Sequence, residues 1–414
     1  MRTAGIICEY NPFHNGHMRQ LRLAREAIGA DGAIVCLMSG NYVQRGGPAI
    51  FSKRVRAEAA VRCGANLVLE LPLTVALSSA EGFAAGGVSI LSALGCDFLC
   101  FGTETGDFDA LRRTAEANLD PAFDVLVRAE LKSGCAYAAA RQRALEQLGA
   151  GEGLRSPNGI LAVEYWKALL RQNSPMRPLP ILRPNTYHAA TLDPEAPSAT
   201  ALRQLLVTPS PWGEGAERRE ADEGLRDACR DKQGSSLQWT YAVPAALHGM
   251  YENAQIHTFQ AGERAMLAIL RTLPDEAFAA LPFGAEGLWS KLMKNCRACA
   301  TVEEILQETK SKRYAHSRVQ RMLLCAVLGL RKAALETPPS YARILAFDAK
   351  GSALLRQMKS RFPLVNAGER PADAAYFALE SRAAALYGLF AVSAPEPPDT
   401  EARLRVFSCS SDKP

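Results

Sequence analysis

The chain has 414 residues, of which 48% are hydrophobic, and a formal net charge of +5. This length predicts two domains or one large domain with an extension, and the hydrophobic content is ample for a buried core. The charge is too modest to establish a nucleic-acid partner, so the distribution of charge along the chain is more informative.

Two features of the sequence bear on where the protein works. No apolar run is long enough to span a membrane, and no secretory signal precedes the first predicted strand. The eleven cysteines are scattered, and Cys8, Cys36 and Cys100 fall in predicted buried strands, where a free thiol acts as a small hydrophobe. We therefore expect a reduced, cytoplasmic protein that contacts no membrane.

The first predicted element is a short buried strand at residues 4–8, followed by a turn and a helix. Asn11 precedes Pro12, and a residue before proline avoids the helical region, so the backbone leaves the strand here. Asn15 and Gly16 suit a helix start. An apolar face at helical spacing follows, made of Met18, Leu21, Ala24 and Ile28.

His14 and His17 thus lie at the N-terminus of the predicted helix. The free backbone N–H groups and the positive end of the helix dipole form a site for phosphate oxygens there, and Gly16 allows close approach. Imidazole donors could stabilise the charge that develops during nucleotidyl transfer, so both histidines are catalytic candidates. The alternative is that they only cap the helix or lie on the surface.

The four residues 14–17 resemble the His-x-Gly-His signature of the nucleotidyltransferase superfamily, and the longer string 9–17 resembles the tRNA(Met) cytidine acetate ligases. These bacterial enzymes use ATP to attach acetate to an anticodon cytidine, so the resemblance implies ATP, acetate and elongator tRNA(Met) as substrates. We expect a set of ATP-binding residues, some from the resemblance and some from the strand ends discussed below. They are Ile7, Cys8, Glu9, Tyr10, Asn11, Pro12, Phe13, His14, Asn15, Gly16, His17, Met18, Arg19, Gln20, Gly102, Asn158 and Arg183.

Three more strands are predicted at residues 33–38, 66–71 and 97–101, alternating with helices. This alternation predicts an α/β fold with a doubly wound, Rossmann-like parallel sheet, whose ligands lie at the carboxyl ends of the strands. Gly102 follows such an end, where a missing side chain would let adenosine pack against the strand. The alternative is a simple turn glycine.

The loop after the second strand contains Gln44 and Arg45, which could reach a phosphate or a carboxylate or could simply be solvated. The resemblance includes a Gln-Arg-Gly at this place and favours function. Asn158 begins a later predicted helix, where asparagine is a common cap, but the resemblance gives the Pro-Asn turn a part in nucleotide binding. Gly159 replaces the family's usual second asparagine.

Arg183 follows a fifth predicted strand at residues 179–182, where its planar guanidinium could grip phosphate oxygens. The next motif resembles the Ser-x-Ser/Thr-x-x-Arg element of many adenylyltransferases, with possible phosphate contacts from Ser198, Thr200 and Arg203. A capped surface helix is the alternative for that motif.

Residues 208–236 are rich in Gly, Glu, Arg and Asp and predict a flexible insertion. We therefore expect a nucleotidyltransferase-like ATP and acetate domain at 1–207 and a mainly helical tRNA-binding region at 237–414. Residues 310–332 contain no acidic side chain, and Tyr314 and His316 lie among the basic residues, as in proteins that stack on unpaired RNA bases. The alternative is a solvated charged face. The candidate tRNA contacts are Lys310, Lys312, Arg313, Arg318 and Arg321.

These patterns predict an ATP-dependent ligase that forms acetyl-adenylate and acetylates N4 of the wobble cytidine, C34, of elongator tRNA(Met). Mg²⁺ is expected with the phosphates, although no metal-ligand cluster is evident and the single C-x-x-C, Cys296 and Cys299, does not suffice for zinc. The alternatives are a small-molecule adenylyltransferase and a non-catalytic RNA-binding protein with a vestigial nucleotide pocket. The sequence does not define the oligomeric state.

Overall fold

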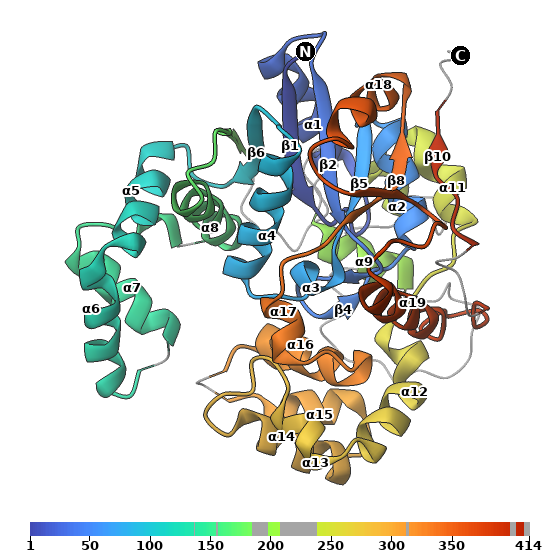
Figure 1. The fold of residues 1–414 in the computed structure, drawn as a ribbon. Helices are drawn as coiled ribbons and strands as arrows, with labels where there is room; N and C mark the ends of the chain where they lie inside the picture. The colour runs from blue at the N-terminus through green and yellow to red at the C-terminus, as the bar shows by residue number, and fades with distance from the viewer. Residues whose placement is uncertain are drawn as a thin grey trace.

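The computed structural model describes residues 1–135, 137–154, 156–183, 198–207, 238–311, 314–397 and 403–409. Its centre is a sheet with strand order β10-β8-β5-β2-β1-β6-β7, in which β9 also pairs with β8 (Figure 1). The strands are β1 Thr3–Cys8, β2 Ala33–Ser39, β5 Leu67–Leu71, β6 Phe98–Thr103, β7 Arg177–Leu182, β8 Ala342–Phe347, β9 Leu364–Asn366 and β10 Phe407–Ser408.

The strands β5-β2-β1-β6-β7 are all parallel, which confirms the predicted doubly wound sheet. Both faces of the sheet are buried: Ile7 of β1 belongs to one core cluster and Ile6 to another. This two-sided burial explains why the strands are almost continuously apolar instead of alternating. The flanking helices are α1 Asn15–Ile28, α2 Lys53–Arg62, α4 Ala80–Ala93, α8 Pro157–Arg171 and α18 Ala349–Met358.

The C-terminal part of the chain also contributes to this sheet, a feature that the sequence patterns did not reveal. Strand β8 runs antiparallel to β5 and places Arg343 opposite Glu70. Both charges are buried, and Lys53 of α2 donates to the Glu70 carboxylate at 2.8 and 2.9 Å. Because buried charges require partners, this cluster fixes the register between the two halves of the chain.

The mainly helical part of the chain packs against the first part through a shared core. Tyr42 and Leu77 belong to the same hydrophobic cluster as Leu323, and the Tyr42 hydroxyl donates to the carbonyl of Ala383 at 2.9 Å. Tyr42 lies in a small hairpin, β3 Tyr42–Val43 and β4 Gly47–Pro48. The main helices here are α12 Phe259–Thr272, α14 Leu288–Ala298, α15 Val302–Thr309, α16 His316–Leu328 and α19 Ala374–Gly388.

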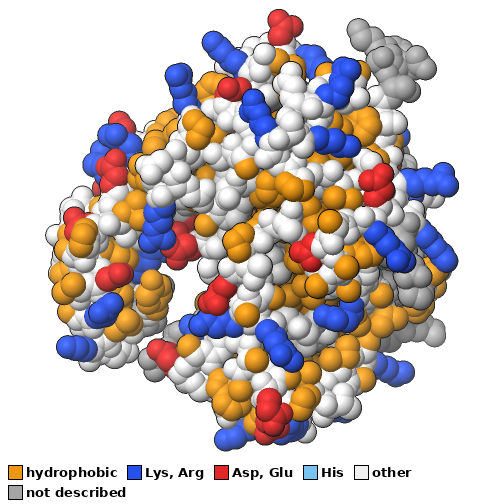
Figure 2. Space-filling model, in the orientation of Figure 1, with side chains coloured by type: hydrophobic (Ala, Val, Ile, Leu, Met, Phe, Trp, Pro, Cys, Tyr) orange, Lys and Arg blue, Asp and Glu red, His pale blue; other side chains and the backbone are white. Residues whose placement is uncertain are grey.

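Another group of helices, α5 Phe108–Leu119, α6 Pro121–Lys132 and α7 Tyr137–Gln147, extends from the β6 side as an arm (Figure 1). Figure 2 shows a hollow between this arm and the helical part that contains α14 and α15. The other described α-helices are α3 Leu73–Ala76, α9 Ala199–Val207, α11 His248–Glu252, α13 Asp275–Ala279 and α17 Lys332–Glu336. Among the helices that the structure describes, none has the length and hydrophobicity needed to cross a bilayer.

Candidate active site

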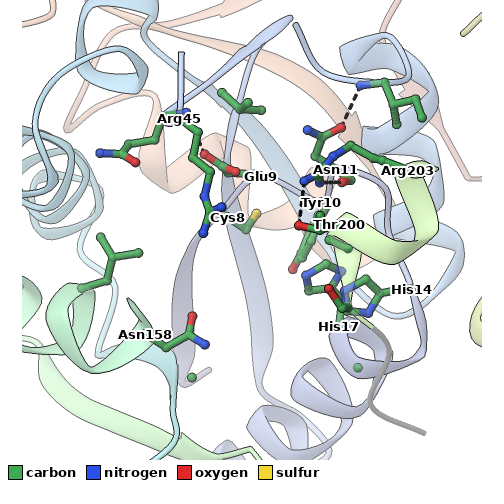
Figure 3. A pocket seen from close by; sticks show the side chains of 18 of the residues that line it. Cys8, Glu9, Tyr10, Asn11, His14, His17, Arg45, Asn158, Thr200 and Arg203 are labelled. Atoms are coloured by element: carbon green, nitrogen blue, oxygen red, sulfur yellow. Dashed lines mark hydrogen bonds between the residues drawn. The ribbon is translucent and has the colours of Figure 1, made fainter. Parts of the chain in front are cut away.

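A cavity of about 550 Å³ lies at the carboxyl ends of β1, β6 and β7, beside the start of α1 (Figure 3). It brings together most of the residues predicted to bind ATP or phosphate. The predicted residues that line it are Ile7, Cys8, Glu9, Tyr10, Asn11, His14, Gly16, His17, Arg19, Gln20, Gly102, Asn158, Arg183, Ser198, Thr200 and Arg203.

Four residues of the predicted ATP set do not line this cavity: Pro12, Phe13, Asn15 and Met18. Phe13 is fully buried and packs edge-on against Tyr10. Asn15 donates to the carbonyl of Tyr241 at 2.9 Å, and Met18 is 40% exposed on α1. These side chains therefore support the turn or face away from the cavity.

The turn between β1 and α1 is held by side chains from distant parts of the chain. The Asn11 carboxamide oxygen accepts from the backbone N–H of Ile50 at 2.7 Å, and Arg203 donates to the Asn11 carbonyl at 2.7 Å. The buried Arg56 guanidinium donates to the carbonyl of Glu9 at 2.6 Å. These bonds hold the turn in one conformation, which fixes the start of α1 at the cavity.

His14 and His17 lie side by side, with ring centroids 3.7 Å apart and planes inclined by 21°. Neither Nδ1 atom has a hydrogen-bond partner among the described residues. Burial, reinforced by Arg183 and Arg203, lowers the pKa of His14 to about 3, and burial together with His14 and Arg183 holds the pKa of His17 well below its usual range. Both rings are therefore neutral near pH 7, a point that the sequence left open.

Positive charge reaches the same end of the cavity from two other segments. The backbone N–H of Arg183 bonds to Thr103 at 2.8 Å, so this arginine continues β7 alongside β6. A Cβ atom on Gly102 would lie 3.3 Å from Cδ of Arg183, so the absent side chain leaves room for this arginine. Arg203 also donates to the Thr200 hydroxyl at 3.1 Å. The arrangement suits an anionic ligand with several oxygens.

Asn158 lies across the cavity from the histidines (Figure 3). Its amide donates to the Glu104 carboxylate, which also accepts from the Ser156 hydroxyl at 2.7 Å. Ser156, rather than Asn158, caps α8 by accepting from the N–H of Gly159 at 3.1 Å. The side chain of Asn158 is therefore held against the end of β6 instead of capping its own helix.

Further lining residues were not identified from the sequence. On the α4 and α8 side, they are Phe83, Phe101, Leu161 and Tyr165. On the hairpin side, they are Val43, Pro48, Ile50, His257, Thr258, Phe259 and Gln320. Apolar residues in helices and strands have the pattern of ordinary core positions, so only the three-dimensional arrangement distinguishes them.

The candidate tRNA contacts have different environments. Lys310 is exposed, whereas Arg318 uses its guanidinium to donate to the carbonyl of Phe283 at 2.8 and 3.1 Å. Arg321 is only 8% exposed and donates to the carbonyl of Gln44 at 3.1 Å, and burial lowers its pKa to about 10. The expectation of a basic surface therefore does not extend to Arg321, because contacts along α16 bury it.

Lys312 and Arg313 lie outside the described residues. On the face that Figure 2 shows, Lys and Arg side chains are distributed among Asp and Glu side chains and do not form one patch. Within the part of the chain that the structure covers, no group of three or more His, Cys, Asp or Glu side chains could hold a metal ion.

Comparison with known proteins identifies the family. The model of the family described as HIGH Nucleotidyl Transferase matches residues 1–401. A tRNA(Met) cytidine acetate ligase from Acetivibrio thermocellus is 34% identical over 381 residues, covering 88% of each chain. Another from a Thermoanaerobacter species is 35% identical over 375 residues, again covering 88% of each chain. The chain belongs to the tRNA(Met) cytidine acetate ligase family.

Solved structures agree with this membership. The apo structure of Thermotoga maritima TmcAL superposes with a TM-score of 0.84 at 27% identity, covering 99% of this chain and all of that one. The same protein bound with alpha-thio ATP superposes with a TM-score of 0.81 and the same coverage. The structural similarity between this chain and the Thermotoga maritima protein thus extends over the sheet, the arm and the helical part.

Proposed function

We propose that this protein is an ATP-dependent ligase that activates acetate as acetyl-adenylate and acetylates N4 of the wobble cytidine, C34, of elongator tRNA(Met). The observation that carries this proposal is the stacked, neutral pair His14 and His17 at the start of α1, facing a cavity with Arg183 and Arg203 in a chain of this family. Neutral imidazoles and fixed cations complement an oxyanion that gains charge in the transition state.

In the first step, an acetate oxygen attacks the α-phosphorus of ATP. A new O–P bond forms, and the bond to the β-phosphate oxygen breaks, so pyrophosphate leaves with the electron pair. His14 and His17 each have one N–H available to donate to phosphate oxygens, because both rings are neutral. Arg183 and Arg203, with hydroxyls of Ser198 and Thr200, stabilise the phosphates that leave.

In the second step, N4 of cytidine attacks the acetyl carbonyl carbon. The C–N bond forms, the bond between the acetyl carbon and the phosphate oxygen breaks, AMP leaves, and N4 loses a proton. N4-acetylcytidine results. The start of α1 can continue to stabilise the phosphate of AMP, because the backbone N–H groups remain in place.

We assign the other residues between 7 and 20 that line the cavity, together with Gly102 and Asn158, to the binding of ATP. Mg²⁺ accompanies the ATP phosphates in this proposal and neutralises their charge. Glu9 already accepts from the N–H of Gln44 at 2.8 Å and Glu104 is bonded to Ser156 and Asn158, so we derive no step from a protein-held metal. Because its proposed substrates include ATP and tRNA, we propose that the protein acts in the cytoplasm.

Pyrophosphate release in the absence of tRNA tests the first step. With ATP and Mg²⁺, release should require acetate. Release that instead requires a nucleotide-cofactor precursor would favour a small-molecule adenylyltransferase. Absence of any release, with tRNA binding retained, would favour a non-catalytic RNA-binding protein.

A further inference from the structure

The cavity has a side that the nucleotide motifs do not occupy. Those motifs follow β1, β6 and β7, whereas Gln44 and Pro48 belong to the hairpin that follows β2. In the sheet, β2 lies next to β1 on the side opposite β6. The second substrate of a two-substrate reaction therefore has space on the β2 side, beyond the start of α1.

Phe259 and Gln320 line this side and converge on one point of the hairpin. A Cβ atom on Gly47 would lie 3.4 Å from Cε2 of Phe259 and 3.6 Å from Nε2 of Gln320. Both side chains are half-buried, and the carboxamide of Gln320 makes no hydrogen bond to any residue that the structure describes. An aromatic ring and an amide with free donor and acceptor atoms thus lie next to each other at the cavity.

The position of Phe259 is coupled to the catalytic turn by a short series of hydrogen bonds. Asn11 accepts from the N–H of Ile50 at 2.7 Å, and the carbonyl of Ile50 accepts from the N–H of His257 at 2.9 Å. Phe259 starts α12 two residues later, and its ring packs edge-on against the buried ring of Phe390, with centroids 6.0 Å apart. The ring is therefore held at a fixed place relative to His14.

The position of Gln320 is fixed by contacts between α16 and the hairpin. Its neighbour Arg321 donates to the carbonyl of Gln44 at 3.1 Å. A Cβ atom on Gly46, whose φ is +85°, would lie only 2.5 Å from the backbone nitrogen of Arg321, so glycine permits this close approach. The same helix carries Arg318, one of the candidate RNA contacts, two residues before Gln320. Helix α16 thus connects the proposed RNA-binding region with the cavity.

We infer that Phe259 and Gln320 form the subsite for the acceptor nucleobase, with the base stacked on the Phe259 ring and its Watson–Crick edge bonded by the Gln320 amide. This inference rests on the proposed function and names the two residues that would bind its acceptor base. Single-stranded bases are recognised in this way, by stacking on aromatic rings and by hydrogen bonds to their edges. The Gln320 oxygen accepts from the N4 amine and its amide donates to N3, which orients N4 before attack. Both are positioning residues.

The test separates activation from transfer in the variants Phe259→Leu, Phe259→Tyr and Gln320→Ala. Acetyl-adenylate formation is measured by acetate-dependent pyrophosphate release without tRNA, and transfer by labelled acetate in elongator tRNA(Met). Stacking on a base contributes about 1–3 kcal/mol, so Phe259→Leu should lower kcat/KM for tRNA by roughly fivefold or more. Phe259→Tyr should restore transfer, because the ring is retained. Acetate-dependent pyrophosphate release should stay at the wild-type rate in all three.

Gln320→Ala keeps the test decisive even if a change at Phe259 disturbs packing, because the amide makes no bond within the described chain. The matched control is Gln307→Ala on α15, an exposed glutamine outside the cavity. Three results would overturn the inference. Gln320→Ala could transfer acetate to tRNA at the wild-type rate, Phe259→Leu and Phe259→Tyr could transfer it equally well, or a variant could lose activation and transfer to the same extent. Failure of the proposed function is distinguishable, because the wild-type protein itself would then acetylate no tRNA.

Discussion

The two sides of the cavity are built from the chain in different ways. The nucleotide side takes ten of its lining residues from the single segment 7–20, and the others come from α4, β6, α8, β7 and residues 198–207. The hairpin side takes residues from the hairpin, from the start of α12 and from the middle of α16. Arg321 of α16 is hydrogen-bonded to Gln44 of the hairpin, although the two residues are 277 positions apart in the sequence. One continuous segment thus supplies both histidines of the nucleotide side, whereas the hairpin side combines separate segments of the chain.

The largest effect is expected from a change on the nucleotide side. His17→Ala should lower acetate-dependent pyrophosphate release by about a hundredfold or more, because a buried donor to the phosphate is lost. Transfer to tRNA should fall equally, since it depends on the first step. The melting temperature should stay near that of the wild type. The control for pyrophosphate release without tRNA is His316→Ala, which removes an exposed histidine outside the cavity. If His17→Ala retained wild-type turnover at saturating ATP, His17 would not be a hydrogen-bond donor to the phosphates.

A smaller effect on the same side is expected for Arg183→Ala. Loss of a charged contact to phosphate costs about 1.5–3 kcal/mol, so ATP affinity should fall by roughly tenfold or more. The matched control is Arg177→Ala, at the opposite end of β7 and exposed. Equilibrium binding of ATP measures both. If the two variants bound ATP equally well, Arg183 would not belong to the phosphate site.

The helical part should affect RNA binding without affecting activation. A variant with Lys310→Ala, Lys312→Ala and Arg313→Ala should bind tRNA more weakly, with a dependence of log affinity on log salt that is shallower by roughly 0.7–0.9 per lost phosphate contact. Pyrophosphate release without tRNA should be unchanged. The control is Lys359→Ala, an exposed lysine after α18. An unaltered slope would identify the three residues as an ordinary solvated face.

A separate prediction concerns the free energy of unfolding at acid pH. The pKa of His14 is about 3 in the folded protein, against 6.5 for a solvated histidine, so the unfolded chain binds more protons below pH 6.5. The free energy of unfolding should therefore decrease as the pH falls from 6.5 towards 3, and His14→Gln should make this decrease shallower. Urea unfolding at several pH values measures the slope. Identical slopes for wild type and variant would show that folding does not lower the pKa of His14.

The sequence predicted the central residues of the nucleotide side because their motifs are local, whereas Phe83, Leu161 and Tyr165 on that side have the pattern of ordinary core residues. A strand, a proline turn and two histidines in one segment predicted the start of α1, and Gly102 and Arg183 were predicted from their positions at strand ends. The protonation of His14 and His17 could not be predicted, because it depends on burial and on Arg183 from another strand.

The hairpin side could not be predicted, because its residues have no distinctive local pattern. Phe259 begins an amphipathic helix and Gln320 lies in a helix of ordinary composition, so neither indicates a site until α12 and α16 pack against the hairpin. Arg321 was grouped with surface charges because sequence spacing does not reveal that its helix is buried there. Strand β8 was missed for a similar reason, since its partner β5 is far away in the chain.

Mass analysis of tRNA shows directly whether the protein transfers acetate to the wobble cytidine. Elongator tRNA(Met) is incubated with the protein, ATP, Mg²⁺ and isotopically labelled acetate, then digested to nucleosides. We expect labelled N4-acetylcytidine from the wobble position, dependent on ATP and formed about a hundredfold or more slowly with His17→Ala. Wild-type protein that forms acetyl-adenylate from labelled acetate but leaves every tRNA nucleoside unlabelled would contradict this expectation.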